Sequence, residues 1–375
     1  MNSLAIFGST GSIGSTSLKI FERNKKKFNL LYLSAHNNYQ KLKFLEKKFN
    51  PKKIILTNKK LNQSICKKDK KIILEKNIFS KNKKKVDYVI SGVSGYEAID
   101  LNFKLLKISK NLLIANKETI ICGGHVFLKE AKKYGCNLIP IDSEHYCINY
   151  FFDRMSNVNI NEIEKIYLIA SGGPLLKKQI RYNEKLKNVL KHPNWKMGKK
   201  ITVDSSNLAN KVLELFEAKI LFGIPGNKLE ILIEPTSNTH AIIKFYNKLY
   251  FTIMHKPEME IPISNGLKLY SKKKLVFNNL SILFNKPNFK KFPIVKLGYK
   301  ILRNYSSVAM IFFTVFNDRL VKLYLNNEIK YGDIPVFLVK AFRAEKVKKY
   351  FSLKIKNKTE LLNVIQIANE FRIIK

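Results

Sequence analysis

The sequence predicts an α/β protein in three parts: an N-terminal parallel sheet covered by helices, a central mixed α/β region, and a small helical C-terminal region. Short apolar runs alternate with helix-length polar and apolar stretches through residues 1–150. Further apolar runs follow over 151–270, and from residue 289 the apolar side chains recur at helical spacing. We expect domains over these two ranges and over 289–375, joined by a Lys-, Asn- and Pro-rich linker at 271–288.

Six short apolar runs predict the strands of the N-terminal domain. They lie at 4–7, 30–33, 53–56, 88–90, 112–114 and 138–141. Each run precedes a helix-length segment, and this rhythm is typical of βαβ units around a parallel sheet.

Five more apolar runs predict strands in the central domain. They lie at 166–170, 200–203, 230–233, 241–245 and 249–253. In the C-terminal domain, Leu297, Ile301, Val308 and Ile311 are spaced like residues on one face of a helix. We therefore expect that domain to be helical.

The chain is strongly basic, with 69 Lys and Arg against 28 Asp and Glu, a formal net charge of +41. Basic chains attract polyanions, so a nucleic-acid-binding protein is one alternative. Almost all of the basic residues are lysines scattered in short runs, however, whereas arginine is the residue that forks onto phosphates and guanines. We expect solvated lysine faces and no nucleic-acid partner.

Targeting features point to the cytoplasm. The most apolar run, near 308–316, is far shorter than the roughly 20 residues that span a bilayer. Residues 1–7 enter a strand at once, which leaves no room for a signal peptide. Four cysteines form no CxxC pair, as expected of a reduced protein: Cys66, Cys122, Cys136 and Cys147. We expect a cytoplasmic protein without a membrane partner.

A glycine-rich turn follows the first predicted strand. Its sequence is GSTGSIG at 8–14, and it opens a helix. Glycines permit a tight turn and the close approach of a pyrophosphate, which the helix N-terminus attracts. Although the spacing is GxxGxxG and not GxGxxG, its place at the first βα turn predicts a Rossmann-like dinucleotide site.

The end of the second predicted strand favours NADP(H). NAD-binding folds usually carry an acidic residue there for the ribose hydroxyls. Here the segment contains His36, Asn37 and Asn38 with no acid, so nothing repels a 2′-phosphate. These three residues, with Lys41, would recognise that phosphate. Lys117, after the 112–114 strand, is expected to contact substrate or cofactor.

Three carboxylates suggest a metal site. Asp142 and Glu144 are two residues apart, so in an extended chain their side chains point the same way. Glu214 would lie on a helix that starts at an Asp204 cap and shows Asn210 and Lys211 on the same face. Three oxygen ligands suit Mg²⁺ or Mn²⁺, and a neighbouring Lys, Asn and Ser cluster suits a phosphate. An enzyme acting on a phosphorylated small molecule is the simplest reading.

Two loops could complete such a site. Ser171 with the following two glycines makes a turn suited to phosphate contact. The only tryptophan, Trp195, lies in a segment punctuated by Pro, Asn and Gly at 192–198. A flap that closes over a bound ligand fits this segment.

Taken together, these motifs resemble the 1-deoxy-D-xylulose 5-phosphate reductoisomerase family. The matching strings are GSTGSIG at 8–14, ANKE at 115–118, PIDSEH at 140–145, SGGP at 171–174, HPNWKMGKK at 192–200 and VDSSNLANKVLELFEA at 203–218. The resemblance implies a homodimeric enzyme that uses NADPH and Mg²⁺, Mn²⁺ or Co²⁺. The implied reaction rearranges and reduces 1-deoxy-D-xylulose 5-phosphate to 2-C-methyl-D-erythritol 4-phosphate in the non-mevalonate isoprenoid pathway.

The resemblance also implies roles for individual residues. The metal would be held by Asp142, Glu144 and Glu214. The substrate would be bound by Lys117, Ser143, Glu144, Ser171, His192, Ser205, Asn210, Lys211 and Glu214. NADPH would be bound by Thr10, Gly11, Ser12, Ile13, His36, Asn37, Asn38, Asn116, Glu118 and Gly198. The catalytic residues would be Lys117, Glu144, His192 and Glu214, without an assignment of which one moves a proton.

Three departures from the family pattern affect residues around the site. Glu234 replaces the first His of HPxSxxH, which keeps Ser237 and His240. Glu260 replaces the Arg of GxPDMRxPI, which we expect to remove a salt-bridge partner. The C-terminal AANE appears as VFND at 315–318. A different NADP-dependent dehydrogenase of a small phosphorylated substrate is a further alternative, although it does not explain the carboxylates.

Overall fold

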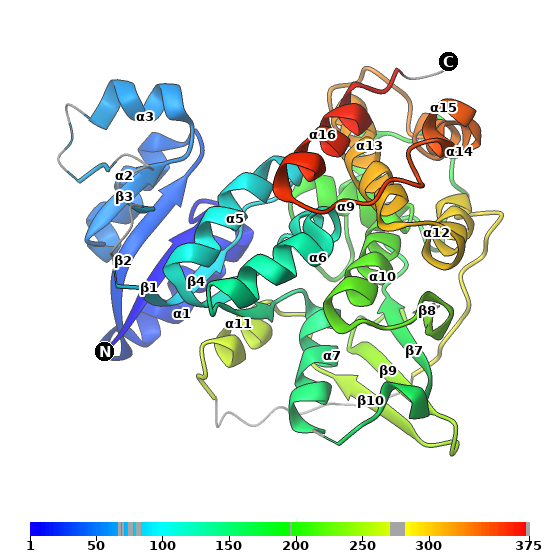
Figure 1. The fold of residues 1–375 in the computed structure, drawn as a ribbon, viewed down its shortest axis with the longest axis horizontal. Coiled ribbons are helices and arrows are strands. Elements are labelled where there is room, and N and C mark those ends of the chain that lie inside the picture. The colour runs from blue at the N-terminus through cyan, green and yellow to red at the C-terminus, as the bar shows by residue number, and fades with distance from the viewer. Residues whose placement is uncertain are drawn as a thin grey trace. The chain divides into compact units, whose positions relative to one another are not determined.

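The computed structural model describes residues 1–66, 69, 71–73, 78–79, 84–155, 157–195, 197–270 and 282–372, apart from the side chain of Cys66. Two compact units make up the chain, and each is described by itself (Figure 1). Among the described residues, no helix is long and apolar enough to cross a membrane.

The first unit is built on a six-stranded sheet in the order β3-β2-β1-β4-β5-β6. Every neighbouring pair is parallel, as the alternation of strands and helices predicts. The strands are β1 (Asn2–Phe7), β2 (Phe28–Ala35), β3 (Lys53–Leu56), β4 (Val86–Ser91), β5 (Ser109–Ile114) and β6 (Asn137–Pro140). All six strands predicted for this domain are confirmed.

Helices enclose this sheet, together with residues 259–271, a later segment of the chain that also belongs to the first unit. Apolar strand residues such as Leu4, Ile6 and Leu33 are fully buried, and Ile263 from this later segment joins their cluster. The helices are α1 (Ser12–Arg23), α2 (Tyr39–Phe49), α3 (Lys59–Cys66), α5 (Ile99–Ile108) and α11 (Glu260–Gly266). Helix α6 (Lys117–Lys133) is interrupted at Gly124, whose φ of 49° is not helical, and its first part belongs to the second unit.

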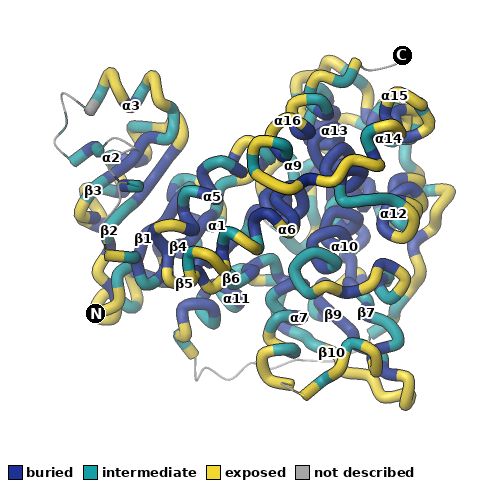
Figure 2. Tube along the Cα trace, viewed as in Figure 1, coloured by how far each residue is buried: buried dark blue, intermediate teal, exposed yellow. Residues whose placement is uncertain are grey.

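The second unit contains a four-stranded sheet in the order β10-β9-β7-β8. Its strands are β7 (Ile163–Ala170), β8 (Leu229–Ile233), β9 (Thr239–Phe245) and β10 (Tyr250–Met254). Only β7 and β8 pair in parallel, so the sheet is mixed. Strand β10 lies at an edge, and its first three residues are exposed (Figure 2).

Helices form the rest of the second unit. Helices α7 (Ser143–Arg154) and α10 (Ala209–Phe222) pack on the sheet, and α8 (Leu186–Val189) and α9 (Lys199–Ser206) precede α10 in the chain. The C-terminal helices are α12 (Pro293–Asn304), α13 (Ser307–Leu325), α14 (Asp333–Arg343), α15 (Glu345–Lys348) and α16 (Lys358–Glu370). Helix α13 is buried on nearly all sides against α9, α14 and α16. The predicted fold class, a parallel-sheet domain, a mixed α/β region and a helical C-terminal region, is confirmed.

Two local predictions are wrong. The expected strand at 200–203 is part of helix α9, because a run of four apolar and polar residues does not distinguish a strand from a helix. The extended chain expected from Asp142 to Glu144 is also absent, since β6 ends at Pro140 and α7 begins at Ser143. Residues 271–281 of the expected linker lie outside the described residues.

Candidate active site

Three carboxylates meet where α7 begins. Asp142 directly precedes α7, Glu144 lies in its first turn, and Glu214 lies on α10. One oxygen from each of them lies within 4.8 Å of the others. The side chains of Glu144 and Glu214 are 11% and 1% exposed. Such a set of buried oxygens fits a hard divalent cation such as Mg²⁺ or Mn²⁺.

Two buried lysines hold these carboxylates. Lys117 donates from Nζ to Asn210 Oδ1 at 2.9 Å and to Glu214 Oε1 at 3.0 Å. Lys211 contacts Glu144 Oε1, pairs with Glu214 Oε2 at 2.6 Å, and donates to a backbone carbonyl at 2.8 Å. Burial lowers the pKa of Lys211, but the two carboxylates outweigh burial and raise it overall. The lysine therefore stays charged.

The junction between α9 and α10 positions Ser205, Asn210, Lys211 and Glu214. Asp204 does not cap the helix as expected: it lies inside α9, and Leu208, with φ of 64°, begins the next helix. Helix α10 then carries Asn210, Lys211 and Glu214 on adjacent turns, as the helical angles predict. Ser205 lies at the end of α9, close to the start of α10.

The Ser171 turn packs against α9. A side chain at Gly173, where φ is 68°, would come within 2.4 Å of the carbonyl oxygen of Ser205. This glycine therefore permits the backbone approach that brings the turn to α9. Ser171 Oγ lies 3.0 Å from His192 Nε2 and accepts from Gly173 N at 3.2 Å.

The protonation of His192 follows from its partners. Its Nδ1 accepts from the backbone N–H groups of Asn194 at 3.2 Å and Trp195 at 3.0 Å. A neutral ring must then carry its proton on Nε2, which donates to Ser171 Oγ. Burial, with the nearby Lys211 charge, lowers the pKa of His192 to about 4. Ser171 already accepts two hydrogen bonds, so its own proton is available to a ligand.

The tryptophan segment is a loop between α8 and α9, as predicted, and Lys196 lies outside the described residues. Asn194 Nδ2 donates to Pro235 O at 2.7 Å and to Ser237 Oγ at 2.9 Å. The Trp195 ring meets His240 edge-on at 6.2 Å, and His240 stacks on His255 at 3.7 Å. These contacts fasten the loop to the turn that precedes β9 and to His240 at the start of β9.

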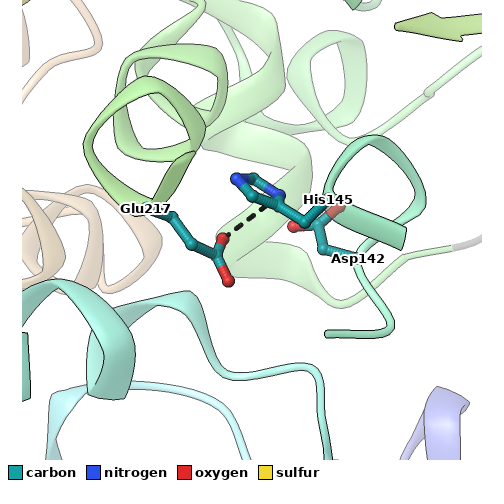
Figure 3. Close-up of side chains that lie close together, drawn as sticks. All are labelled: Asp142, His145 and Glu217. Carbon is teal, nitrogen blue, oxygen red and sulfur yellow. Dashed lines mark ion pairs between the residues drawn. The ribbon is translucent and has the colours of Figure 1, made fainter. Parts of the chain in front are cut away.

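A second polar group lies beside the carboxylates. His145 and Glu217 face each other with Asp142 beside them, and ligand atoms of all three lie within 4.8 Å of one another (Figure 3). His145 Nδ1 lies 3.4 Å from Glu217 Oε2, and Nε2 lies 3.0 Å from Glu214 O. Because a carbonyl only accepts, Nε2 carries a proton. His145 thus connects α7 to α10 beside Glu144 and Glu214, a role that the sequence pattern alone does not reveal.

In the first unit, the glycine turn at 8–14 has a geometry suited to a dinucleotide. Gly8 has φ of 79°, and a side chain at Gly14 would meet Gly8 O at 2.4 Å. Ser34 holds the turn through hydrogen bonds to Gly8 and Ser9. The following residues, Thr10, Gly11, Ser12 and Ile13, lead into α1, whose N-terminal amides favour an anion.

The residues after β2 lie near this turn. Lys41 Nζ donates to Thr10 O at 2.8 Å, and Asn38 caps α2 by accepting from Lys41 N at 2.9 Å. His36 Nδ1 lies 3.0 Å from Thr57 Oγ1, and the side chain of Asn37 accepts from Asn58. The structure therefore brings Lys41 to the glycine turn.

The remaining expected cofactor residues divide between the two units. In the first unit, Asn116 donates to the carbonyls of Val93 and Gly95 at 2.9 and 3.0 Å. In the second unit, Gly198 is the N-cap of α9, and Glu118 forms a buried ion pair with Lys200. The sequence pattern does not reveal the role of Lys200, because the strand predicted at 200–203 hides the i,i+4 relation of Lys200 to Asp204.

The departures from the family pattern have structural roles. Glu234 is buried and accepts from the backbone N–H groups of Thr236, Asn238 and Thr239 at 2.6, 3.2 and 3.4 Å. Glu260 pairs with Arg23 at 2.8 Å, so the substituted position still forms an ion pair, although with a basic partner.

Comparison with known sequences identifies the family. Residues 4–124 match the family model of 1-deoxy-D-xylulose 5-phosphate reductoisomerase, and 138–222 and 254–374 match its two C-terminal domain models. A curated 1-deoxy-D-xylulose 5-phosphate reductoisomerase of Pelagibacter ubique (strain HTCC1062) is 42% identical, with 97% of each chain covered. The reductoisomerase of Francisella tularensis subsp. holarctica (strain FTNF002-00 / FTA) is 34% identical, with 88% of this chain and 89% of that one covered.

Solved structures of reductoisomerases resemble the structure of this chain. A DOX-P reductoisomerase in complex with NADPH, fosmidomycin and magnesium has a TM-score of 0.87 and 26% identity, covering 99% of this chain and 97% of that chain. The reductoisomerase of Zymomonas mobilis in complex with NADPH, at 22% identity, shares the fold with a TM-score of 0.82, covering 98% of this chain and 97% of that chain. With family models matched over most of its length and close relatives matched nearly end to end, the chain belongs to the 1-deoxy-D-xylulose 5-phosphate reductoisomerase family.

Proposed function

We propose that this chain converts 1-deoxy-D-xylulose 5-phosphate to 2-C-methyl-D-erythritol 4-phosphate, using NADPH and a divalent cation, as a step of isoprenoid biosynthesis. One observation carries the proposal. Glu144 and Glu214 share the buried Lys211, Glu214 also shares the buried Lys117 with Asn210, and a third carboxylate, Asp142, lies beside them. The family membership indicates the reaction that these carboxylates and lysines would serve.

The three carboxylates fit Mg²⁺ or Mn²⁺ by charge, donor type and spacing. We infer that Asp142, Glu144 and Glu214 hold this cation. When bound, it supplies Lewis acidity toward the ketone and hydroxyl oxygens of the substrate. Lys117 touches Glu214, so it is placed to hold or move a proton at this site.

The phosphate of the substrate would be bound by donors on two elements. Ser171 has a hydroxyl proton to give, and Lys211 and Asn210 offer donors from α10. Ser205 and Ser143 would complete this set, and neutral His192 holds Ser171 in place. Binding a remote phosphate can orient the reacting carbons and favour closure of the Trp195 loop.

NADPH would lie on the glycine turn of the first unit and supply a hydride. Residues 10–13 offer amides at the start of α1, while Asn116 directly precedes α6 and Glu118 lies in its first turn. We propose that His36, Asn37, Asn38 and Lys41 favour the 2′-phosphate, because no acid stands among them.

We propose a homodimer in the cytoplasm. Within the part of the chain that the structure describes, no strand pairs with the outer edge of β10, and Leu249 and Tyr250 at its start are both 57% exposed. A second copy could cover this edge, as exposed edges are usually covered. Three cysteines, Cys122, Cys136 and Cys147, are buried free thiols, which suits a reducing compartment.

The experiment is NADPH oxidation by the purified chain with 1-deoxy-D-xylulose 5-phosphate, with and without Mg²⁺ or Mn²⁺, with the product identified by mass spectrometry. Oxidation that requires both substrate and cation is expected. In a parallel assay with NADP⁺, cation-independent oxidation of a hydroxy acid would support another dehydrogenase, and salt-sensitive retention of DNA or RNA without turnover would support the nucleic-acid alternative. Either result would overturn the proposal.

A further inference from the structure

Lys200 lies among three buried carboxylates from three helices. Its Nζ pairs with Glu118 Oε1 on α6, with Asp204 Oδ2 on α9 at 2.9 Å, and with Asp318 Oδ1 on α13 at 3.8 Å. The three carboxylate side chains are only 5%, 0% and 1% exposed. All four residues belong to the second unit. Lys200 is thus the cation that all three buried carboxylates share.

The C-terminal helix α13 takes part in this cluster. Asn317 Nδ2 donates to Asp204 Oδ1 at 2.8 Å, so Asp204 is held from both sides. Lys322 pairs with Asp318 Oδ2 at 3.0 Å, and its side chain is 46% exposed. The VFND variant of the family motif therefore supplies two polar groups to the cluster through its last two residues.

The charges keep Glu118 ionised. Burial raises the pKa of Glu118, but Lys200 outweighs burial and the pKa falls overall. Burial lowers the pKa of Lys200, and the three carboxylates raise it well above the usual range. Loss of Lys200 would leave Glu118 in a buried position without its ion-pair partner.

The cluster touches several parts of the proposed active site. Glu118 follows Lys117, which contacts Asn210 and Glu214. Lys200 stands two residues after Gly198, where the Trp195 loop enters α9. A shift of Glu118 or of the start of α9 would therefore reach groups expected to meet NADPH.

We propose that Lys200 is a positioning residue that fixes the carboxylate of Glu118 for NADPH and joins it to the end of the Trp195 loop. This inference rests on the proposed function. Lys200 itself need not touch cofactor or substrate. Its effect should therefore appear in NADPH affinity and not in the affinity for the metal.

The test measures NADPH binding by fluorescence titration without substrate, and Mn²⁺ binding by calorimetry. Lys200→Met is expected to weaken NADPH binding about tenfold or more, because small misplacements of binding groups have large effects. Mn²⁺ affinity should change by less than about twofold, since the metal ligands keep their own lysines. Lys200→Arg keeps the charge and should restore part of the NADPH affinity.

Lys322→Met is the matched control, because Lys322 meets the same Asp318 from the exposed side. It should bind NADPH like the wild type. In a Glu118→Gln background, Lys200→Met should cause little further loss, because the carboxylate that it positions is already gone. Equal further loss in that background would show a general structural effect and would overturn the inference.

Removing a buried cation can prevent folding. In that case Lys200→Met/Asp318→Asn keeps the net charge of the cluster, and the same loss of NADPH affinity is expected. Wild-type affinity in either folded variant would overturn the inference while leaving the proposed function intact. If the wild type itself binds no NADPH, the proposed function fails and this inference fails with it.

Discussion

Lys211 Nζ lies 2.6 Å from Glu214 Oε2, one helical turn further along α10, and also contacts Glu144 on α7. Two carboxylates from different helices therefore share one ammonium ion. All three side chains are almost completely buried, so their charges interact strongly. The pair that we expect to hold a cation is already arranged around a positive charge.

Lys211→Met should make the chain more dependent on metal. Without the lysine, Glu144 and Glu214 lose a shared counter-ion, and breaking a buried pair costs about 3–5 kcal/mol. Mn²⁺ should bind more tightly and raise the melting temperature more than in the wild type. Substrate KM should rise as well, because a phosphate donor is lost.

Thermal unfolding with and without Mn²⁺ checks this prediction. Lys219→Met is the control, since Lys219 lies on the same helix and donates to Leu302 O at 2.9 Å. An equal Mn²⁺ shift in Lys211→Met and the wild type would contradict the proposed role of the lysine.

Glu214→Gln should abolish metal-dependent turnover while NADPH affinity stays nearly unchanged. Losing an outer partner of a metal ligand already costs about 10–100-fold, so losing a ligand should cost at least about 100-fold. Glu217→Gln changes the neighbouring carboxylate on α10, which faces His145, and should retain more activity. Steady-state kinetics over a Mn²⁺ series would test this, and metal-dependent activity persisting in Glu214→Gln would refute the ligand assignment.

Trp195 should report ligand binding. It is the only tryptophan, and its ring lies 6.2 Å from His240 while its backbone N–H binds His192. A phosphorylated ligand that engages Ser171 and His192 should move the loop and change the indole emission. Emission would be recorded during titration with substrate, with unphosphorylated 1-deoxy-D-xylulose as the control. A flat signal at saturating substrate would argue against the flap.

Much of the fold could be predicted because strands in a covered parallel sheet are short, continuous apolar runs. Residues 53–56, for example, have the same bounds in the sequence pattern and in β3. The strand predicted at 200–203 is wrong because four residues are too few to show a helical or a strand periodicity. Tertiary partners such as Asp318 stabilise the helix there. The expected metal ligands Asp142 and Glu144 do meet, although through a helix start and not through strand alternation.

The partners of buried charges could not be predicted, because they come from distant segments. Lys200 meets Asp318 more than a hundred residues further along the chain. In the sequence, Glu234 only replaces a histidine of the family pattern. In the structure, its carboxylate accepts backbone hydrogen bonds that organise the loop before β9. Such roles depend on which backbone amides lie nearby, and a single sequence does not contain that information.

Glu234→Ala should destabilise the chain by about 1–3 kcal/mol, because partly or fully buried backbone N–H groups would lose their acceptor. Three N–H groups depend on this carboxylate. Glu234→Gln keeps one acceptor oxygen and should lose less stability. Urea unfolding at constant Mn²⁺ measures both variants, and an unchanged midpoint for Glu234→Ala would contradict the capping role.

Acid should destabilise the chain in part through His255. Burial, together with the stacked His240, lowers the pKa of His255 from 6.5 to about 3. Between these values the unfolded chain binds a proton that the folded chain does not, so this stability is complete above pH 6.5 and is lost as the pH falls toward 3. His255→Phe keeps an aromatic ring for the stack and cannot titrate.

The variant should therefore lose less stability than the wild type between pH 7 and pH 4, whatever its stability at neutral pH. Urea unfolding at intervals across that range gives the slope for each protein. His36→Phe is a suitable comparison, since His36 is exposed just after β2 and lies in the other unit. Parallel slopes for His255→Phe and the wild type would mean that His255 takes up its proton in the folded chain as easily as in the unfolded one.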